Sequence, residues 1–229
     1  MKQPETRRLS WEECRRWLED APRLQEIHWT TDPVRHRIEG WVAGREQRVM
    51  VFRPPLPWPV LPGEGRFLPE YMHTVGSNPE PYVLFLFQAG AAAMGYFEEG
   101  IPVLHKAMKK YVRRASQGQA QIYFLKRKGK SKAGSRLRLN NQQALFEEVN
   151  ERLTEWMEEY NPRRILYSCN PTLWGMLFSA KPEPPFDRKD PRLGKVPFDV
   201  QEPDFEELQR INRLILTGEL TIHDPEVLR

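Results

Sequence analysis

The sequence has little of what marks secreted, metal-binding or membrane proteins. Its two cysteines, Cys14 and Cys169, are far apart and belong to no Cys-x-x-Cys pair, so the pattern indicates no zinc site and suggests no disulfide. No apolar run approaches the length that spans a bilayer, and the first residues lack the apolar core of a signal peptide. We therefore expect a cytoplasmic protein with no metal ion, no cofactor and no membrane anchor, and we expect it to be a monomer.

Acidic residues are missing from one long interval of the chain. No Asp or Glu occurs between Glu99 and Glu147, although the same interval contains twelve Lys and Arg residues. The whole chain has 35 basic and 31 acidic residues, so the remainder, with 23 basic and 31 acidic residues, is acidic. A face that meets only solvent normally mixes both signs. The interval therefore indicates a polyanionic partner whose phosphates supply much of the affinity.

Hydrophobic and turn patterns divide the chain into three predicted parts. Residues 1–80 are predicted to form a small α+β module, because Ser10 and Glu13 have the spacing of a helix capping box and two strand-like stretches flank Gly44. Residues 181–229 are predicted to form a proline-rich linker and a C-terminal helix that begins after Asp204.

Residues 81–180, between these parts, have the pattern of a mixed α/β fold. The run Val83–Phe87 is apolar at every position, as expected for a strand that is buried on both faces. A later stretch, 137–160, has apolar residues at the helical period, with acids and glutamines on its other face. We predict a mixed sheet with helices packed on it. The predicted strands lie at 83–87, 91–97, 101–112 and 164–169, and the predicted helices at 137–160 and 171–180.

Residues 116–135 are rich in Gly, Gln, Lys and Ser and are predicted to be a long exposed loop. The front of this loop, residues 117–121, has the sequence Gln-Gly-Gln-Ala-Gln and contains no nucleophile, strong base or metal ligand. Chemistry at this loop would have to depend on a neutral amide and the backbone. Cleavage of the activated ester of peptidyl-tRNA is such a reaction, since it needs a placed water and N–H donors for the oxyanion. A polar loop without a catalytic role would have the same composition.

Two short blocks in and after this loop resemble a known family. Tyr111, the pair Arg114-Ala115, and Gly118 with Gln121 match a Tyr, an Arg-Ala pair and a Gly-x-x-Gln loop. Residues 133–138 and Asn141 match a second block, Ser-Ala-Gly-Ser-x-Leu-Arg followed by Asn. Both blocks belong to the release-factor-like peptidyl-tRNA hydrolases of ribosome-associated quality control, the Vms-like release factor domains. The resemblance covers residues 82–180, and the short build suggests a bacterial member.

The sequence departs from this family pattern at a few positions. Asn140 and Gln142 stand where the family has Tyr and Glu, and the apolar residues 122–124 follow Gln121 where small polar residues are common.

The resemblance implies a catalytic domain related to that of class-one release factors, with an RNase H-like α/β layering. Its loop would enter the peptidyl-transferase centre of a large ribosomal subunit that is stalled with peptidyl-tRNA. The implied catalytic residue is Gln121, with Gln119 second and with Gly118 allowing close backbone approach. The expected partners are the large subunit, its rRNA and peptidyl-tRNA. The residues expected to bind RNA are Lys109, Lys110, Arg113, Arg114, Lys126, Arg127, Lys128, Lys130, Lys132, Arg136 and Arg138.

Two alternatives remain open at this stage. The bond that is cut could be a phosphodiester near the tRNA 3′ end, which would make the protein an endonuclease of the same complexes. A non-catalytic factor would instead use residues 106–138 only to bind the ribosome or its rRNA. Replacing Gln121 separates these classes, because a binding factor would keep its function and an enzyme would lose it.

The charge pattern predicts steeply salt-dependent binding to large subunits, because each phosphate contact releases counterions. Changing Lys126, Arg127, Lys128 and Lys130 to Glu should abolish co-sedimentation with large subunits while the circular dichroism spectrum stays unchanged. Unchanged sedimentation of this variant at moderate salt would show that these four residues do not contact the subunit.

Overall fold

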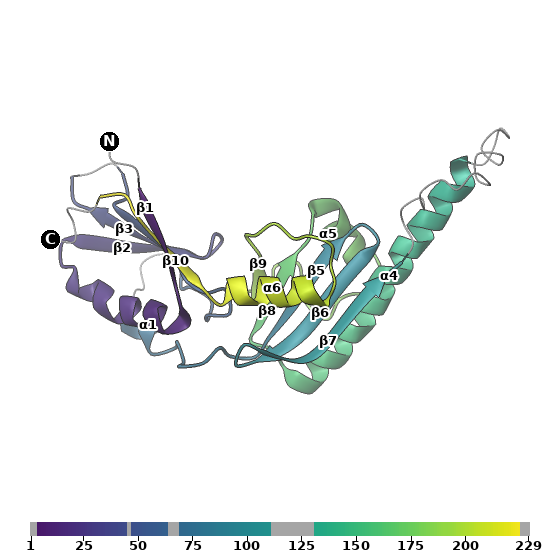
Figure 1. The fold of residues 1–229 in the computed structure, drawn as a ribbon, viewed down its shortest axis with the longest axis horizontal. Coiled ribbons are helices and arrows are strands. Elements are labelled where there is room, and N and C mark those ends of the chain that lie inside the picture. Colours follow the sequence, from purple (N-terminus) through teal and green to yellow (C-terminus); the bar gives the residue numbers. More distant parts are fainter. Residues whose placement is uncertain (1–3, 45–46, 64–68, 111–130, 225–229) are drawn as a thin grey trace.

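The computed structural model describes residues 4–44, 47–63, 69–110 and 131–224, and within 131–139 it describes the helical backbone alone. These residues form two five-stranded sheets in two neighbouring lobes (Figure 1). Among the helices of the described part, none combines the length and the apolar character needed to cross a membrane.

The first lobe is an antiparallel sheet. Its strands are, in spatial order, β1 (Glu5–Leu9), β10 (Gly218–Ile222), β4 (Met50–Arg53), β3 (Arg37–Val42) and β2 (Ile27–Asp32). Two helices, α1 (Trp11–Asp20) and α2 (Pro69–Met72), belong to this lobe. The predicted capping box is confirmed at the start of α1, where the Ser10 hydroxyl accepts from Glu13 N–H and the Glu13 carboxylate accepts from Ser10 N–H at 2.7 Å. The two strand-like stretches that flank Gly44 are β3 and β4, which pair antiparallel.

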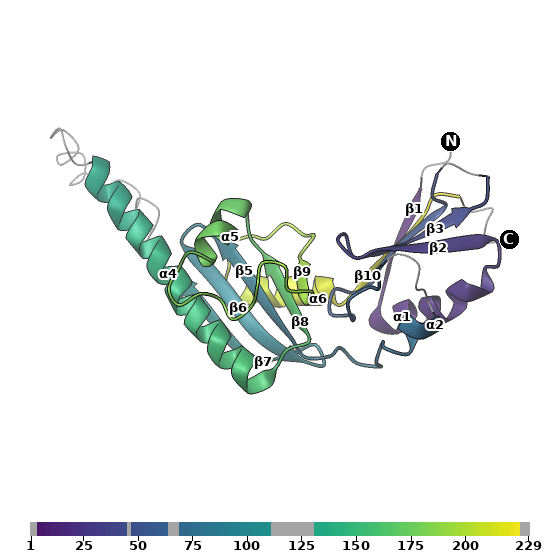
Figure 2. The same ribbon diagram turned by 180° about the vertical axis from the view of Figure 1, so that it is seen from behind.

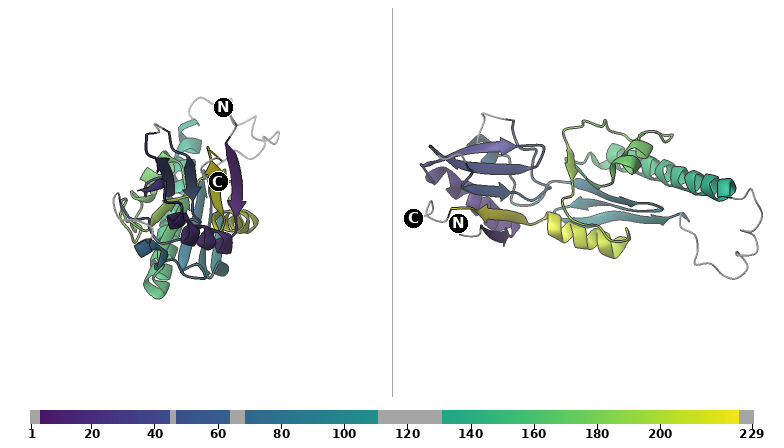
Figure 3. Two further views of the ribbon diagram at one scale, coloured as in Figure 1. Left: turned by 90° about the vertical axis from the view of Figure 1, so that its left-hand side faces the viewer. Right: turned by 90° about the horizontal axis from the view of Figure 1, so that it is seen from above.

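The second lobe is a mixed sheet between two layers of helices. Its strands are, in spatial order, β7 (Ile101–Lys109), β6 (Ala91–Glu98), β5 (Tyr82–Gln88), β8 (Arg164–Ser168) and β9 (Leu193–Lys195). Strand β8 runs parallel to β5 and β9, and the other pairs are antiparallel. Helices α4 (Ser131–Tyr160) and α5 (Pro171–Leu177) cover one face and α6 (Phe205–Ile215) the other, as Figure 3 shows from above. The predicted α/β class is confirmed.

Strand β5 forms the centre of this lobe. Its side chains alternate between two cores: Val83, Phe85 and Phe87 pack in the cluster that includes α4 and α5. Leu84 and Leu86 pack in the cluster that includes α6. Because both faces are covered, the strand is apolar at every core position, which is the pattern visible in the sequence.

Helix α4 begins earlier than the sequence predicts. Residues 131–135, expected in the loop, are its first turns. The apolar period marks only the part that packs on the sheet, since the buried side chains described for α4 begin at Gln142. The first turns of α4 run past the sheet (Figures 1 and 2). Residues 131–136 have Ala133 as their single apolar residue, so no helical apolar period marks the start of α4.

The segment after residue 180 contains two strands that the sequence analysis did not expect. Strand β9 pairs with Ile165, Leu166 and Tyr167 of β8, and β10 lies between β1 and β4 of the first sheet. Both are short and pair with residues far away in sequence, so local patterns do not reveal them. The segment therefore serves both lobes: α6 packs on the second sheet and β10 continues into the first.

Gly218, the first residue of β10, predicts a stability test. A Cβ at this position would overlap Cys14 Sγ and would lie 3.1 Å from the Arg53 carbonyl oxygen. Gly218→Ala should therefore lower the free energy of unfolding by about 1–3 kcal/mol, as overpacking does, measured by urea denaturation. Gly175→Ala in α5 is the matched control, because an added Cβ there meets nothing within 4 Å. Equal stability of both variants would contradict the close packing of β10 on α1.

Candidate functional site

The structure describes the frame that holds the predicted loop. The candidate catalytic residues Gln121, Gly118 and Gln119 lie in 111–130, outside the described residues. So do Arg113, Arg114, Lys126, Arg127, Lys128 and Lys130. Lys132, Arg136 and Arg138 lie on the first turns of α4, where the backbone alone is described. Lys109 and Lys110 are described in full. Their expected RNA contacts stay predictions.

The turn between β5 and β6 contacts both Lys110, which follows β7, and Gln142 of α4. Lys110 N–H, the last described donor before the 111–130 segment, donates to the Gly90 carbonyl at 2.9 Å. Gly90 N–H in turn donates to Gln142 Oε1 of α4 at 3.0 Å. Gly90 has φ +83°, a conformation that glycine adopts without strain. One residue of the turn thus binds the chain both before and after the predicted loop.

Gln142 is the polar residue that the sequence pattern misplaced. The helical period put the glutamines of 137–160 on the polar face, but Gln142 is only 5% exposed. It lies one turn before Phe146, whose ring contacts Phe87 with centroids 5.3 Å apart. The partner of Gln142 is the backbone of Gly90 in another element, and no local signal in the sequence marks such a partner.

Both described lysines at the base of the loop have acidic partners. Lys110 Nζ lies 2.8 Å from Glu148 Oε2 of α4, and Lys109 Nζ lies 3.1 Å from Glu202 Oε1. Both acids lie outside the acid-free interval of the sequence. Since all four side chains are partly exposed, each pair is weak. A phosphate that approaches Lys109 or Lys110 would have to compete with a carboxylate.

Helix α4 carries the other end of the loop away from the sheet. At 1.5 Å per residue, its described length is about 45 Å, and Figure 2 shows its first turns beyond the strands. Lys132, Arg136 and Arg138 lie in these turns. The described end of the second lobe is therefore a projecting helix beside the exit of β7.

A shallow cleft of about 400 Å³ lies at the carboxyl ends of β5 and β8. Ser168, Cys169, Asn170 and Asp199 line it together with Gln88, whose Nε2 donates to the Val200 carbonyl at 2.6 Å. Burial raises the pKa of the Cys169 thiol to about 12, so the group is a protonated thiol near neutral pH. Cys169 is thus a poor nucleophile.

Within the described ranges, no group of three or more His, Cys, Asp or Glu side chains could hold a metal ion. The His105 ring stacks on Phe205, with centroids 4.0 Å apart.

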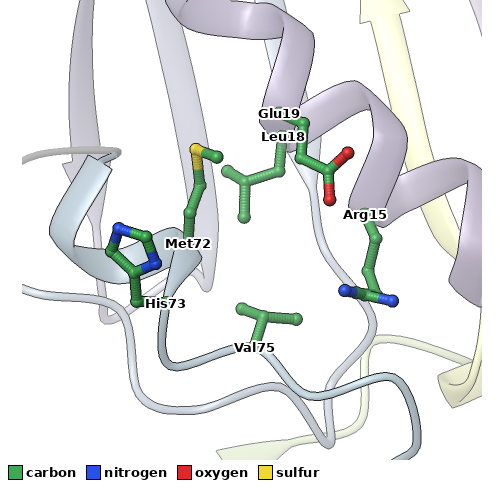
Figure 4. A pocket seen from close by; sticks show the side chains of 6 residues that line it. All are labelled: Arg15, Leu18, Glu19, Met72, His73 and Val75. Carbon is green, nitrogen blue, oxygen red and sulfur yellow. The ribbon is translucent and has the colours of Figure 1, made fainter.

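A second cleft, of about 370 Å³, lies in the first lobe. Figure 4 shows Arg15 and Glu19 of α1 facing Met72, His73 and Val75. These residues belong to the other lobe from the loop frame and include no pair of groups in the arrangement of a nucleophile and its base.

Comparisons with known proteins agree with the resemblance found in the sequence. The family model described as "bVLRF1: Bacteroidetes VLRF1 release factor" matches residues 82–222. The "tRNA endonuclease ANKZF1" of Homo sapiens is 30% identical over 167 residues, which are 72% of this chain and 23% of that protein. The "tRNA endonuclease vms-1" of Caenorhabditis elegans is 28% identical over 134 residues, 57% of this chain and 21% of that protein.

This chain therefore corresponds to less than a quarter of the length of these relatives. A solved structure titled "Vms1 mitochondrial localization core" covers 88% of this chain and 77% of its own at 12% identity, with a TM-score of 0.47, and adds nothing to the family match. The family match includes the frame of the predicted loop and spans more than half of the residues. This chain belongs to the Bacteroidetes VLRF1 release factor family.

Proposed function

We propose that this protein is a ribosome-dependent peptidyl-tRNA hydrolase that releases nascent chains from stalled large subunits. Membership of a release factor family carries the proposal. The described frame supports it: Gly90 bonds to Lys110, directly before the 111–130 segment, and to Gln142 of α4, twelve residues after that segment.

The proposed chemistry depends on placement rather than on a charged catalyst. The peptidyl-tRNA ester is already activated, so Gln121 would orient a water against the carbonyl and would direct an N–H toward the developing oxyanion. Gly118 would let the backbone approach the ester, since it has no side chain. No metal ion or organic cofactor takes part in this scheme.

The proposed partners are the rRNA of the large subunit and the tRNA, in the cytoplasm. The positive residues of the interval between Glu99 and Glu147 would contact their phosphates. Lys109 and Lys110 would contribute less than the rest, because each already has a carboxylate within 3.1 Å. The protein would act as a monomer.

A second candidate reaction is cleavage of a phosphodiester near the tRNA 3′ end. The names of the relatives, which are called tRNA endonucleases, favour it. Both reactions would place the same loop against the same end of the tRNA, and they differ in the product: intact tRNA for the hydrolase, tRNA without its terminal nucleotides for the endonuclease.

Substitutions of the loop glutamines test the proposal. Gln121→Ala should bind stalled large subunits normally but release peptide about 10²–10³ times more slowly, the usual cost of one oxyanion donor. Gln119→Ala should have a milder effect, and Gln117→Ala is the matched control with near-normal release. Gly118→Val should fail, since a β-branched side chain restricts the backbone and blocks close approach.

The measurement is single-turnover release of a labelled nascent chain from purified large subunits, with the freed tRNA 3′ ends sequenced. Release at the wild-type rate by Gln121→Ala would refute its assignment as the catalytic residue. Shortened tRNA ends would assign the reaction to the endonuclease class.

A further inference from the structure

The contacts of Gln142 go beyond what helix packing requires. Its side chain is buried in α4, three and four residues before the fully buried Leu145 and Phe146. An apolar residue would suit this position, because the neighbouring core is apolar. Gln142 Oε1 instead accepts a hydrogen bond from Gly90 N–H, and its buried Nε2 has no hydrogen-bond partner among the described residues. A buried amide with an unmet donor is costly, so packing alone does not account for it.

What the Gly90 bond does is fix a distance between two elements. The Gly90 carbonyl also accepts from Lys110 N–H at 2.9 Å. The backbone of Gly90 therefore links the residue that follows β7 to Gln142 of α4. The Lys110–Glu148 ion pair, 2.8 Å long, joins the same two elements at the level of their side chains. We name these four residues, Gly90, Lys110, Gln142 and Glu148, the loop anchor.

We propose that Gln142 is a positioning residue for peptide release, acting through the loop anchor, an inference that rests on the proposed function. It contacts neither tRNA nor peptide. The bond to Gly90 holds the end of β7 and helix α4 in fixed relative positions, and it would thereby position a catalytic amide carried on the chain between them. Glu148 has a smaller part, since its pair with Lys110 is partly exposed.

The size of the effect follows from the geometry of catalysis. A displacement of about 1 Å in a reacting group can cost on the order of 10²-fold in rate. Binding to the subunit, which depends on many charges spread over the interval, should tolerate such a displacement. Loss of the anchor should therefore separate release from binding.

The test compares two substitutions of Gln142 in the full-length chain. Gln142→Leu keeps the volume and removes the acceptor, and it should slow single-turnover release by about 10- to 100-fold while affinity for large subunits changes less than about threefold. Gln142→Glu keeps an oxygen that accepts from Gly90 N–H, and it should release within about threefold of the wild type. If the leucine variant does not fold, Gln142→Met, which keeps the side-chain length, replaces it.

Asn150→Leu is the matched control. Asn150 is a fully buried amide on the same helix, but its Nδ2 donates to the Leu177 and Pro182 carbonyls, away from the loop anchor. This variant should lose thermal stability without a selective loss of release. Hydrogen exchange gives a second measurement: the Gly90 and Lys110 amides should exchange faster in Gln142→Leu and at the wild-type rate in Asn150→Leu.

Three results would overturn the inference while leaving the proposed function intact. One is release near the wild-type rate by Gln142→Leu in an assay where Gln121→Ala is slow. Another is equal slowing in Gln142→Glu, which would mean that the acceptor for Gly90 is not what matters. The third is equal slowing in Asn150→Leu, which would assign the effect to general destabilisation. Full activity of Gln121→Ala would refute the assigned catalytic residue, whereas the exchange rates still report whether Gln142 holds Gly90.

Discussion

The burial of strand β5 on both faces is the constraint on which the second lobe depends. Phe85 and Phe87 lie under α4 and α5, and Leu84 and Leu86 lie under α6. Each such side chain contributes about 1.5–3 kcal/mol when it is removed from water. With β5 held in this way, the turn that follows Gln88 has a fixed position. Strand β6 follows that turn and pairs with β7. Through Gly90, the turn also holds the residue after β7 and Gln142 of α4 in place.

The chemistry proposed for this family member makes such rigidity matter. A neutral amide is a weak catalyst, and its contribution comes from where it stands. In the proposed function, the protein frame would position the catalytic amide, whereas the basic side chains would contact RNA phosphates. Lys109 and Lys110, the last two described residues before the 111–130 segment, pair with Glu202 and Glu148, so their charges are balanced. In the proposed function, the other basic residues of the interval between Glu99 and Glu147 would supply most of the attraction to RNA.

The sequence allowed prediction of those elements whose signals are local. The capping box of Ser10 and Glu13 and the apolar run of β5 each depend on residues that are close together in the chain. The start of α4 could not be predicted, because its first turns have no face against the sheet. Nor could the burial of Gln142, whose partner Gly90 lies in another element. The catalytic assignment to Gln121 came from motif resemblance alone and concerns residues outside the described part.

The position of β10 has a consequence for how the protein is made. Strand β1 pairs with β10 at all five of its positions, and β10 also pairs with β4. During synthesis, the first sheet therefore cannot be completed until β10, which ends at Ile222, has been made. Its other four strands are synthesised before the second lobe. Until then β4 has an open edge, and open edges invite wrong pairing or recognition by chaperones. A chain whose translation stopped before β10 would expose the unpaired edge of β4, and that edge would distinguish it from a chain that contains β10.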